Sequence, residues 1–220
     1  GKAVVTGYPV RKALTSASRA EARQQLGLEP EALTLLVTGG SRGARSINLA
    51  VSAAAGDVLH RWQIVHITGH LDYETVLAAR AGLSQELQAR YHVYEYLHEE
   101  MVAALAAADL VLARAGASVL GELPARGLPG ILVPYPHAGR HQEANAAYLV
   151  SRGAALRVSD ESLGRELSGL LRELAEQPER LREMAERAKA LACPDAAAAV
   201  ARQLMELASG SPWGRRQWAS

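Results

Sequence analysis

The sequence contains a single cysteine, few aromatic residues and no apolar run that approaches the length of a membrane span. With Cys193 alone, the chain can form no internal disulfide and no cysteine-based zinc site. This cysteine content is typical of a reducing, cytoplasmic compartment. Aromatic residues make up 5% of the chain, which favours closely packed, alanine-rich helices over an aromatic-lined barrel. The sequence thus predicts neither a membrane span of ~18 residues nor a signal peptide.

The chain also lacks an excess of either charge, because 24 basic residues stand against 23 acidic ones for a net charge of +1. This balance provides no overall attraction to nucleic acid, and we predict no nucleic-acid partner. Hydrophobic residues form 49% of the 220 residues, which is enough for a sizeable core in one large α/β domain or two small ones. Because the chain starts in an apolar run without an initiating methionine, we expect a fragment of a longer protein.

Short apolar runs alternate with helical patterns through residues 33–158. The strands predicted from these runs are residues 33–38, 64–68, 92–94, 110–113, 130–133 and 155–158. The helices predicted between them are residues 47–55, 73–81, 85–91, 101–108, 119–126 and 142–152. Continuous apolar strands separated by helices indicate a parallel sheet that is buried on both faces. With right-handed crossovers, this α/β pattern predicts a doubly wound, Rossmann-like core over residues 1–160.

The pattern from Ser162 onward is purely helical, and we expect helices that begin near Ser162, Pro178 and Ala196. We expect these C-terminal helices, residues 161–208, to pack on the same domain. The last segment, 209–220, is basic and carries two tryptophans without periodicity, Trp213 and Trp218. It is either a flexible terminus or a contact with a membrane surface.

Ligands of open α/β sheets bind beyond the carboxyl ends of the strands, where this sequence places several polar or glycine-rich segments. Segment 39–44, Gly-Gly-Ser-Arg-Gly-Ala, opens a helix, so its backbone N–H groups and Ser41 suit a phosphate, although a plain tight turn is the alternative. It matches neither G-x-G-x-x-G nor a P-loop. After the strand at 110–113, Ser118 is a candidate helix cap and Glu122 lies one turn further on the same side. A carboxylate there can accept both hydroxyls of a ribose or simply complement the helix dipole.

Two further segments carry candidate binding residues. The proline-bracketed loop 134–145 is dense in hydrogen-bonding groups, and Gln142 and Asn145 lie three apart on one helical face, which suits a sugar. The histidines of this loop have no evident carboxylate or cysteine partner, so no metal is predicted. Segment 5–11 is typical of a strand end that turns into a lone arginine, Arg11, which either neutralises phosphate charge or is solvated. These junctions together predict a binding edge on one sheet.

The segments 6–11, 39–44, 114–122 and 127–145 resemble, in that order, the MurG family of peptidoglycan N-acetylglucosaminyltransferases. The resemblance spans about residues 4–190 and implies the C-terminal, donor-binding half of a two-domain GT-B fold, without the N-terminal acceptor domain. It implies the following donor contacts: the backbone at Leu97 for the uracil, Ala117, Ser118 and Val119 for the diphosphate, Glu122 for the ribose, Gln142 and Asn145 for the sugar, and Arg11 and Ser41 on the phosphate side. Val119, His141 and Tyr8 depart from the residues that are frequent in the family.

The resemblance implies transfer of N-acetylglucosamine from UDP-N-acetylglucosamine, with inversion, to a lipid-linked muramyl-peptide acceptor, so that lipid I becomes lipid II. No cofactor is implied, and the sequence has no Asp-x-Asp motif of the metal-dependent transferases. The general base is expected from the N-terminal domain, and the full-length protein is expected in the cytoplasm, peripheral on the inner face of the cell membrane. The alternatives are a UDP-N-acetylglucosamine 2-epimerase or other GT-B transferase, and a non-catalytic nucleotide-sugar-binding module.

Overall fold

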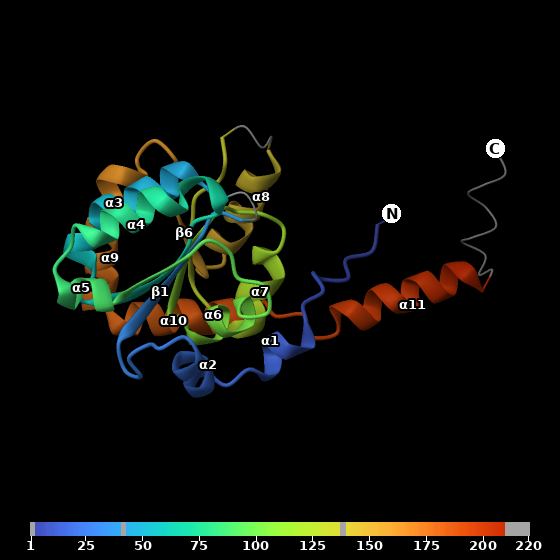
Figure 1. Cartoon of the computed structure of the whole chain (residues 1–220). Coiled ribbons are helices and arrows are strands. Elements are labelled where there is room, and N and C mark those ends of the chain that lie inside the picture. Colours follow the sequence, from blue (N-terminus) through green and yellow to red (C-terminus); the bar gives the residue numbers. More distant parts are fainter. Residues whose placement is uncertain (1–2, 41–42, 137–139, 210–220) are drawn as a thin grey trace.

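The computed structural model describes residues 3–40, 43–136 and 140–209, and shows one parallel sheet with helices on both faces (Figure 1). The strands in chain order are β1 (Leu33–Thr38), β2 (Trp62–Ile67), β3 (Tyr91–Tyr94), β4 (Leu110–Ala113), β5 (Gly130–Leu132) and β6 (Ala155–Arg157). Their order across the sheet is β3-β2-β1-β4-β5-β6. This order confirms the predicted doubly wound, Rossmann-like fold and puts its topological switch point between β1 and β4.

The helices form two layers that cover opposite faces of the sheet. The first layer contains α1 (Lys12–Ser16), α2 (Arg19–Gln25), α6 (Met101–Ala107), α7 (Val119–Arg126) and α8 (His141–Val150). The second layer contains α3 (Arg45–Val58), α4 (Tyr73–Ala81) and α9 (Leu163–Glu176). The other helical segments are the 3-10 turn η1 (His70–Asp72), α5 (Gln85–Ala89), α10 (Pro178–Lys189) and α11 (Ala196–Ala208). Since α10 contacts both α9 and α7, it joins the two layers.

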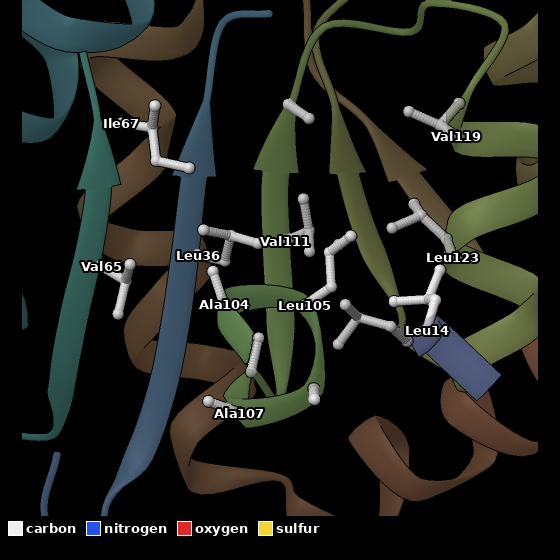
Figure 2. Packing of buried hydrophobic residues seen from close by; sticks show 14 of the residues in the cluster. Leu14, Leu36, Val65, Ile67, Ala104, Leu105, Ala107, Val111, Val119 and Leu123 are labelled. Atoms are coloured by element: carbon white, nitrogen blue, oxygen red, sulfur yellow. The ribbon is translucent and has the colours of Figure 1, made fainter. Parts of the chain in front are cut away.

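The core lies between each layer and the sheet. Figure 2 shows Leu36, Val65 and Val111, from three adjacent strands, beside Ala104 and Leu105 of α6. Neighbouring residues on the same strands point to the α3 side, because successive side chains of a strand face opposite ways. Both faces are therefore apolar, which explains the continuous hydrophobic runs in the sequence.

The N-terminal segment is not the strand that the sequence predicts. Val4 and Val5 are 66% and 97% exposed, and residues 3–11 pair with no strand in the described part of the chain. The segment lies instead along α7, where Tyr8 is so close to Gly121 that a Cβ on this glycine would lie 2.8 Å from the tyrosine ring. Strand propensity alone was insufficient, because a strand also needs a neighbouring edge to pair with.

The helices α1 and α2 were not predicted, although the sequence carries a signal for α2. Ser18 caps α2 by accepting a hydrogen bond from the Glu21 N–H at 3.4 Å, and a serine followed three residues later by glutamate is a capping-box pattern. The helix is short, at 7 residues, and its apolar positions are too few to show a clear period.

The C-terminal helices differ in how they pack. The helix α9 packs on α3, and α10 packs on α7, so both add to the domain. The helix α11 departs from the expectation that all of residues 161–208 pack on the core: it buries only Ala196, and it extends away from the sheet in Figure 1. Its apolar residues Leu204, Met205 and Leu207 are 54–62% exposed. The tail beyond residue 209, with Trp213 and Trp218, lies outside the described residues.

We expect Leu36→Ala to lower the free energy of unfolding by about 2–5 kcal/mol, because Leu36 is fully buried between the sheet and α6. The matched control is Leu204→Ala on α11, whose side chain is 62% exposed, and it should change the same quantity by less than about 0.5 kcal/mol. Urea denaturation measures both values. Equal losses in the two variants would contradict the packing described for α6 and α11.

Candidate functional site

A cavity of about 680 Å³ opens at the carboxyl edge of the sheet, next to the switch point between β1 and β4. Its walls come from segments that follow β1, β2, β4, β5 and β6, so the whole width of the sheet except the β3 edge contributes. The lining residues are Gly39, Gly43, Ala44, Arg45, Ser46, Leu71, Asp72, Arg114, Tyr135, Pro136, Gln142 and Asp160. The position agrees with the rule that ligands of open α/β sheets bind at the switch point.

The loop after β1 forms one wall, and it lies directly on the segment after β2. Gly43 has a φ of +75°, and a Cβ at this position would overlap the carbonyl oxygen of Thr68. The loop closes on itself through a 2.9 Å hydrogen bond from the Gly43 N–H to the Gly40 carbonyl. Only glycine fits this conformation and this contact. Ser41, predicted to face phosphate, lies outside the described residues.

The guanidinium of Arg114 joins several strand ends at the cavity wall. It donates to Asp160 at 2.5 Å, to the Ser46 hydroxyl at 2.8 Å and to the Val133 carbonyl at 3.2 Å. Its central carbon lies 5.2 Å from the centre of the Tyr135 ring, which is within the range of a cation–π contact. Since Arg114 is mostly buried and its partners follow β1, β5 and β6, it fixes the relative positions of these loops.

The side chains of Gln142 and Asn145 both project from the first turns of α8, but only one of them lines the cavity. The Tyr135 N–H donates to Gln142 Oε1 at 2.9 Å, so the amide oxygen is occupied and the amide nitrogen is the group available to a ligand. Asn145 Nδ2 donates to the Ala115 carbonyl at 3.0 Å. Asn145 therefore ties α8 to the turn after β4 and holds Gln142 next to that turn.

The turn between β4 and α7 presents the remaining predicted contacts. Ala117 is exposed and Ser118 is half-buried, and within the described residues their N–H groups donate to no protein acceptor. The Val119 N–H donates to the Gly116 carbonyl at 3.3 Å, and the Val119 side chain is buried. An anion that approaches this turn therefore meets the N–H groups of Ala117 and Ser118 at the positive end of α7.

Glu122 lies one turn into α7, half-buried and without an ion-pair partner within 4.0 Å among the described residues. Burial raises the pKa of the Glu122 carboxyl above its ordinary value, and the Ser118 hydroxyl and the charge of Arg11 act in the opposite direction. A carboxylate that has lost part of its hydration and holds no cation is suited to accept hydroxyl hydrogen bonds.

Arg11 and Leu97 lie apart from the 680 Å³ cavity. Arg11 lines a separate groove of about 440 Å³ between α1, α2 and α6, and it is near enough to act on the charge of Glu122. The side chain of Leu97, after β3, is buried in the core, so only its backbone can contact a ligand. The predicted residues thus divide into a group at the α7 turn and a group at α8, joined by Asn145.

Two ion pairs line the cavity, and both contain residues to which the sequence assigned no role. Arg45 donates to Asp72 at 2.7 Å, and the second pair is Arg114 with Asp160. Each of these residues follows the carboxyl end of a strand, which is the signal that could have identified them. Among the described residues, no group of three or more His, Cys, Asp or Glu side chains is arranged to hold a metal ion.

The sequence matches the glycosyltransferase family 28 C-terminal domain over residues 34–200. The chain belongs to this family. A relative from Roseiflexus sp. (strain RS-1), named UDP-N-acetylglucosamine--N-acetylmuramyl-(pentapeptide) pyrophosphoryl-undecaprenol N-acetylglucosamine transferase, is 50% identical over 214 residues, which cover 88% of this chain and 48% of the relative. A relative of the same name from Desulfitobacterium hafniense (strain Y51) is 46% identical over 200 residues, which cover 89% of this chain and 54% of the relative.

The fold of this family 28 domain is also that of a solved relative. The crystal structure of Acinetobacter baumannii MurG superposes with a TM-score of 0.72 and 28% sequence identity, and the match covers 90% of this chain and 57% of that one. The chain spans about half the length of the curated relatives that it matches. The family resemblance seen in the sequence is therefore confirmed.

We expect Gly43→Ala to lower the free energy of unfolding of the family 28 domain by about 1–3 kcal/mol, because alanine is strained at positive φ and would meet the Thr68 carbonyl. The matched control is Gly56→Ala in α3, where a Cβ meets no atom within 4 Å, and it should raise the same free energy by about 0.5–1 kcal/mol. Chemical denaturation of both variants measures the difference. A Gly43→Ala variant as stable as the parent would contradict the close loop contact.

We expect Glu122→Gln to melt at a higher temperature than the parent at pH 7. Because burial raises the native pKa of Glu122, the folded state binds its proton more tightly than the unfolded state, and stability falls as pH rises from the ordinary glutamate pKa through the raised one. Glutamine cannot ionise, so the advantage should shrink as pH is lowered below the ordinary value. Thermal melts between pH 3.5 and 8 measure this, with the 74%-exposed Glu179→Gln as control. A pH-independent difference would contradict it.

Proposed function

We propose that this chain is the donor-binding half of an inverting glycosyltransferase that uses UDP-N-acetylglucosamine. The whole protein transfers N-acetylglucosamine to a lipid-linked muramyl-peptide acceptor, converting lipid I to lipid II in peptidoglycan synthesis. The printed names of the curated relatives support this reaction, and family membership supports the assignment of this chain to the C-terminal half. The acceptor is bound by the other half of the full-length protein.

The observation that carries the proposal is the connection between the β4–α7 turn and α8. The 3.0 Å hydrogen bond from Asn145 Nδ2 to the Ala115 carbonyl holds Gln142 beside the turn that precedes Glu122. A carboxylate for one sugar and an amide for another thus flank backbone N–H groups that suit a diphosphate. A nucleoside diphosphate sugar has this sequence of groups: ribose, pyrophosphate, hexose.

Each donor group has a proposed partner. The diphosphate binds the N–H groups of Ala117 and Ser118, beside Val119, with Ser41 and Arg11 on the phosphate side. Glu122 accepts the ribose hydroxyls, and the backbone at Leu97 contacts the uracil. Gln142 donates its amide N–H groups to hydroxyls of the N-acetylglucosamine, and Asn145 keeps α8 in place for this contact.

Catalysis in this proposal depends on stabilising the UDP leaving group. An acceptor hydroxyl attacks the anomeric carbon, the bond to the β-phosphate oxygen breaks, and negative charge grows on the diphosphate. The N-termini of α3 and α7 and the guanidinium of Arg11 stabilise this charge without a metal ion. The base that removes the hydroxyl proton comes from the N-terminal half, so this chain alone binds donor weakly and turns over negligibly.

The proposed location follows from the acceptor. A lipid-linked muramyl-peptide presents its sugar at the inner face of the cell membrane, so the full-length protein acts in the cytoplasm and peripherally on that face. Within the described residues, no helix combines the length and the hydropathy needed to cross a bilayer. No cofactor and no nucleic-acid partner are part of the proposal.

We expect the chain to bind UDP in a calorimetric titration and Glu122→Ala to weaken that binding by at least about tenfold. The loss corresponds to hydrogen bonds to a charged acceptor, at about 1.5–3 kcal/mol each. Glu179→Ala on α10, an equally sized change at a 74%-exposed carboxylate, is the control and should bind as the parent does. A parent chain that binds no UDP would contradict the proposal.

The same proposal separates a transferase from an epimerase in the full-length protein. Incubation with radiolabelled UDP-N-acetylglucosamine and lipid I should move the label to the lipid fraction, whereas a 2-epimerase would change the donor sugar without any acceptor.

A further inference from the structure

A series of buried hydrogen bonds leads from Tyr91, at the start of β3 on the α3 face of the sheet, to the cavity. His66 lies in β2 with no exposed surface, and its ring nitrogens contact Tyr91 Oη at 2.9 Å and Asn48 Oδ1 at 3.0 Å. Asn48, in α3, donates through Nδ2 to the Thr68 carbonyl at 2.8 Å and to Asp72 Oδ2 at 2.9 Å. Neither His66 nor Tyr91 lines the cavity, yet the series that they begin ends on its wall.

The partners fix the direction of every hydrogen bond in this series. Asn48 Nδ2 faces two acceptors, a carbonyl and a carboxylate, so the amide nitrogen must be on that side and Oδ1 must face His66. Since Oδ1 only accepts, His66 must carry its proton on Nε2, and Nδ1 must accept from the Tyr91 hydroxyl. Burial lowers the pKa of His66 to about 3, so the imidazole is neutral and can hold this arrangement.

The Asn48 amide holds the two groups that shape the cavity wall. The Thr68 carbonyl that it binds is the atom on which Gly43 rests, with no room for a Cβ between them. The Asp72 carboxylate that it binds also accepts from Arg45 at 2.7 Å, and Asp72 and Arg45 both line the cavity. If the Asn48 amide rotated by half a turn, Oδ1 would face the Thr68 carbonyl and the Asp72 carboxylate, and both contacts would become repulsive.

We propose that His66 is a positioning residue for the diphosphate of the donor: by donating from Nε2 to Asn48 Oδ1, it fixes the Asn48 amide and thereby the contact of the Thr68 carbonyl with Gly43 and the Asp72–Arg45 pair. The inference rests on the proposed nucleotide-sugar function. It assigns a binding role to a side chain that never touches the ligand, and it explains why a histidine occupies a fully buried strand position where an apolar residue would pack at lower cost.

Two substitutions at the same position separate positioning from packing. In His66→Gln, the side-chain amide reaches as far as Nε2 and can still donate to Asn48 Oδ1, while the contact with Tyr91 is lost. In His66→Asn, the shorter amide reaches only as far as Nδ1, so Tyr91 keeps a partner and Asn48 loses its donor. Both variants truncate one buried ring and lose one hydrogen bond, so similar falls in melting temperature are expected.

Calorimetric titration with UDP gives the decisive readout. We expect His66→Gln to bind within about threefold of the parent and His66→Asn to bind about tenfold more weakly, the size of one lost buried hydrogen bond. Equal UDP affinity in the two variants overturns the positioning role, whether both match the parent or both fall with their melting temperature. Failure of the parent to bind UDP is a different result, because it overturns the proposed function itself.

The tautomer of His66 can be tested in the unmodified protein. This test does not depend on whether the variants fold. Nitrogen-15 NMR of the labelled parent distinguishes a protonated Nε2 from a protonated Nδ1 at His66. We expect the proton on Nε2, unchanged between pH 5 and pH 8. A proton on Nδ1 overturns the proposal, because Asn48 Oδ1 would then face a lone pair.

Discussion

The contact between the Gly43 backbone and the Thr68 carbonyl is the constraint on which the edge of this sheet depends. It brings the loop after β1 against the segment after β2, with no space for a side chain between them. The cavity wall, the start of α3 and the Asp72–Arg45 pair all take their positions from this contact. A loop of glycines is often described as flexible, but here the glycine permits a close and directional contact.

The electrostatics of the cavity follow from pairing rather than from free charge. Arg45 and Arg114 each lie beside a carboxylate, so neither brings an uncompensated positive charge to the wall. In the proposed donor complex, attraction for the diphosphate comes from backbone N–H groups at the start of α3, which lines the cavity, and at the start of α7, which does not. Fixed dipoles of this kind need no reorganisation when charge develops on a leaving group.

Much of the fold was predictable from the sequence, because apolar runs and glycine turns are local signals. The strands at 33–38 and 110–113 and the helix at 119–126 have the predicted bounds. Three of the four predicted strand-end segments contribute to the cavity, through Gly39, Arg114 and Gln142, whereas Arg11 of segment 5–11 lines a separate groove. The strand prediction for the N-terminal segment was wrong, because a strand also requires a neighbouring strand edge to pair with. The apolar pattern of the segment does not show whether such an edge is present. Exposure of α11 was missed for a related reason, since an amphipathic pattern predicts an apolar face but not what lies against it.

The details of the site were less predictable, since they depend on residues far apart in the chain. Arg114 donates a hydrogen bond to Asp160, which lies 46 residues later in the chain, and Asn48 donates one to Asp72, which lies 24 residues later. The sequence could suggest that Gln142 faces a ligand, but not that the Tyr135 N–H already occupies its oxygen. Likewise, the sequence could not show that the Val119 N–H already donates a hydrogen bond to the Gly116 carbonyl.

The residues that line the cavity range from Gly39, just after the first strand, to Asp160, just after the last strand. A molecule bound there touches both ends of the Rossmann-like unit at once. Partial unfolding at either end would remove part of its binding surface, so occupancy penalises frayed states as well as the fully unfolded one. Binding in this cavity therefore links the unfolding of the loop after β1 to that of the loop after β6.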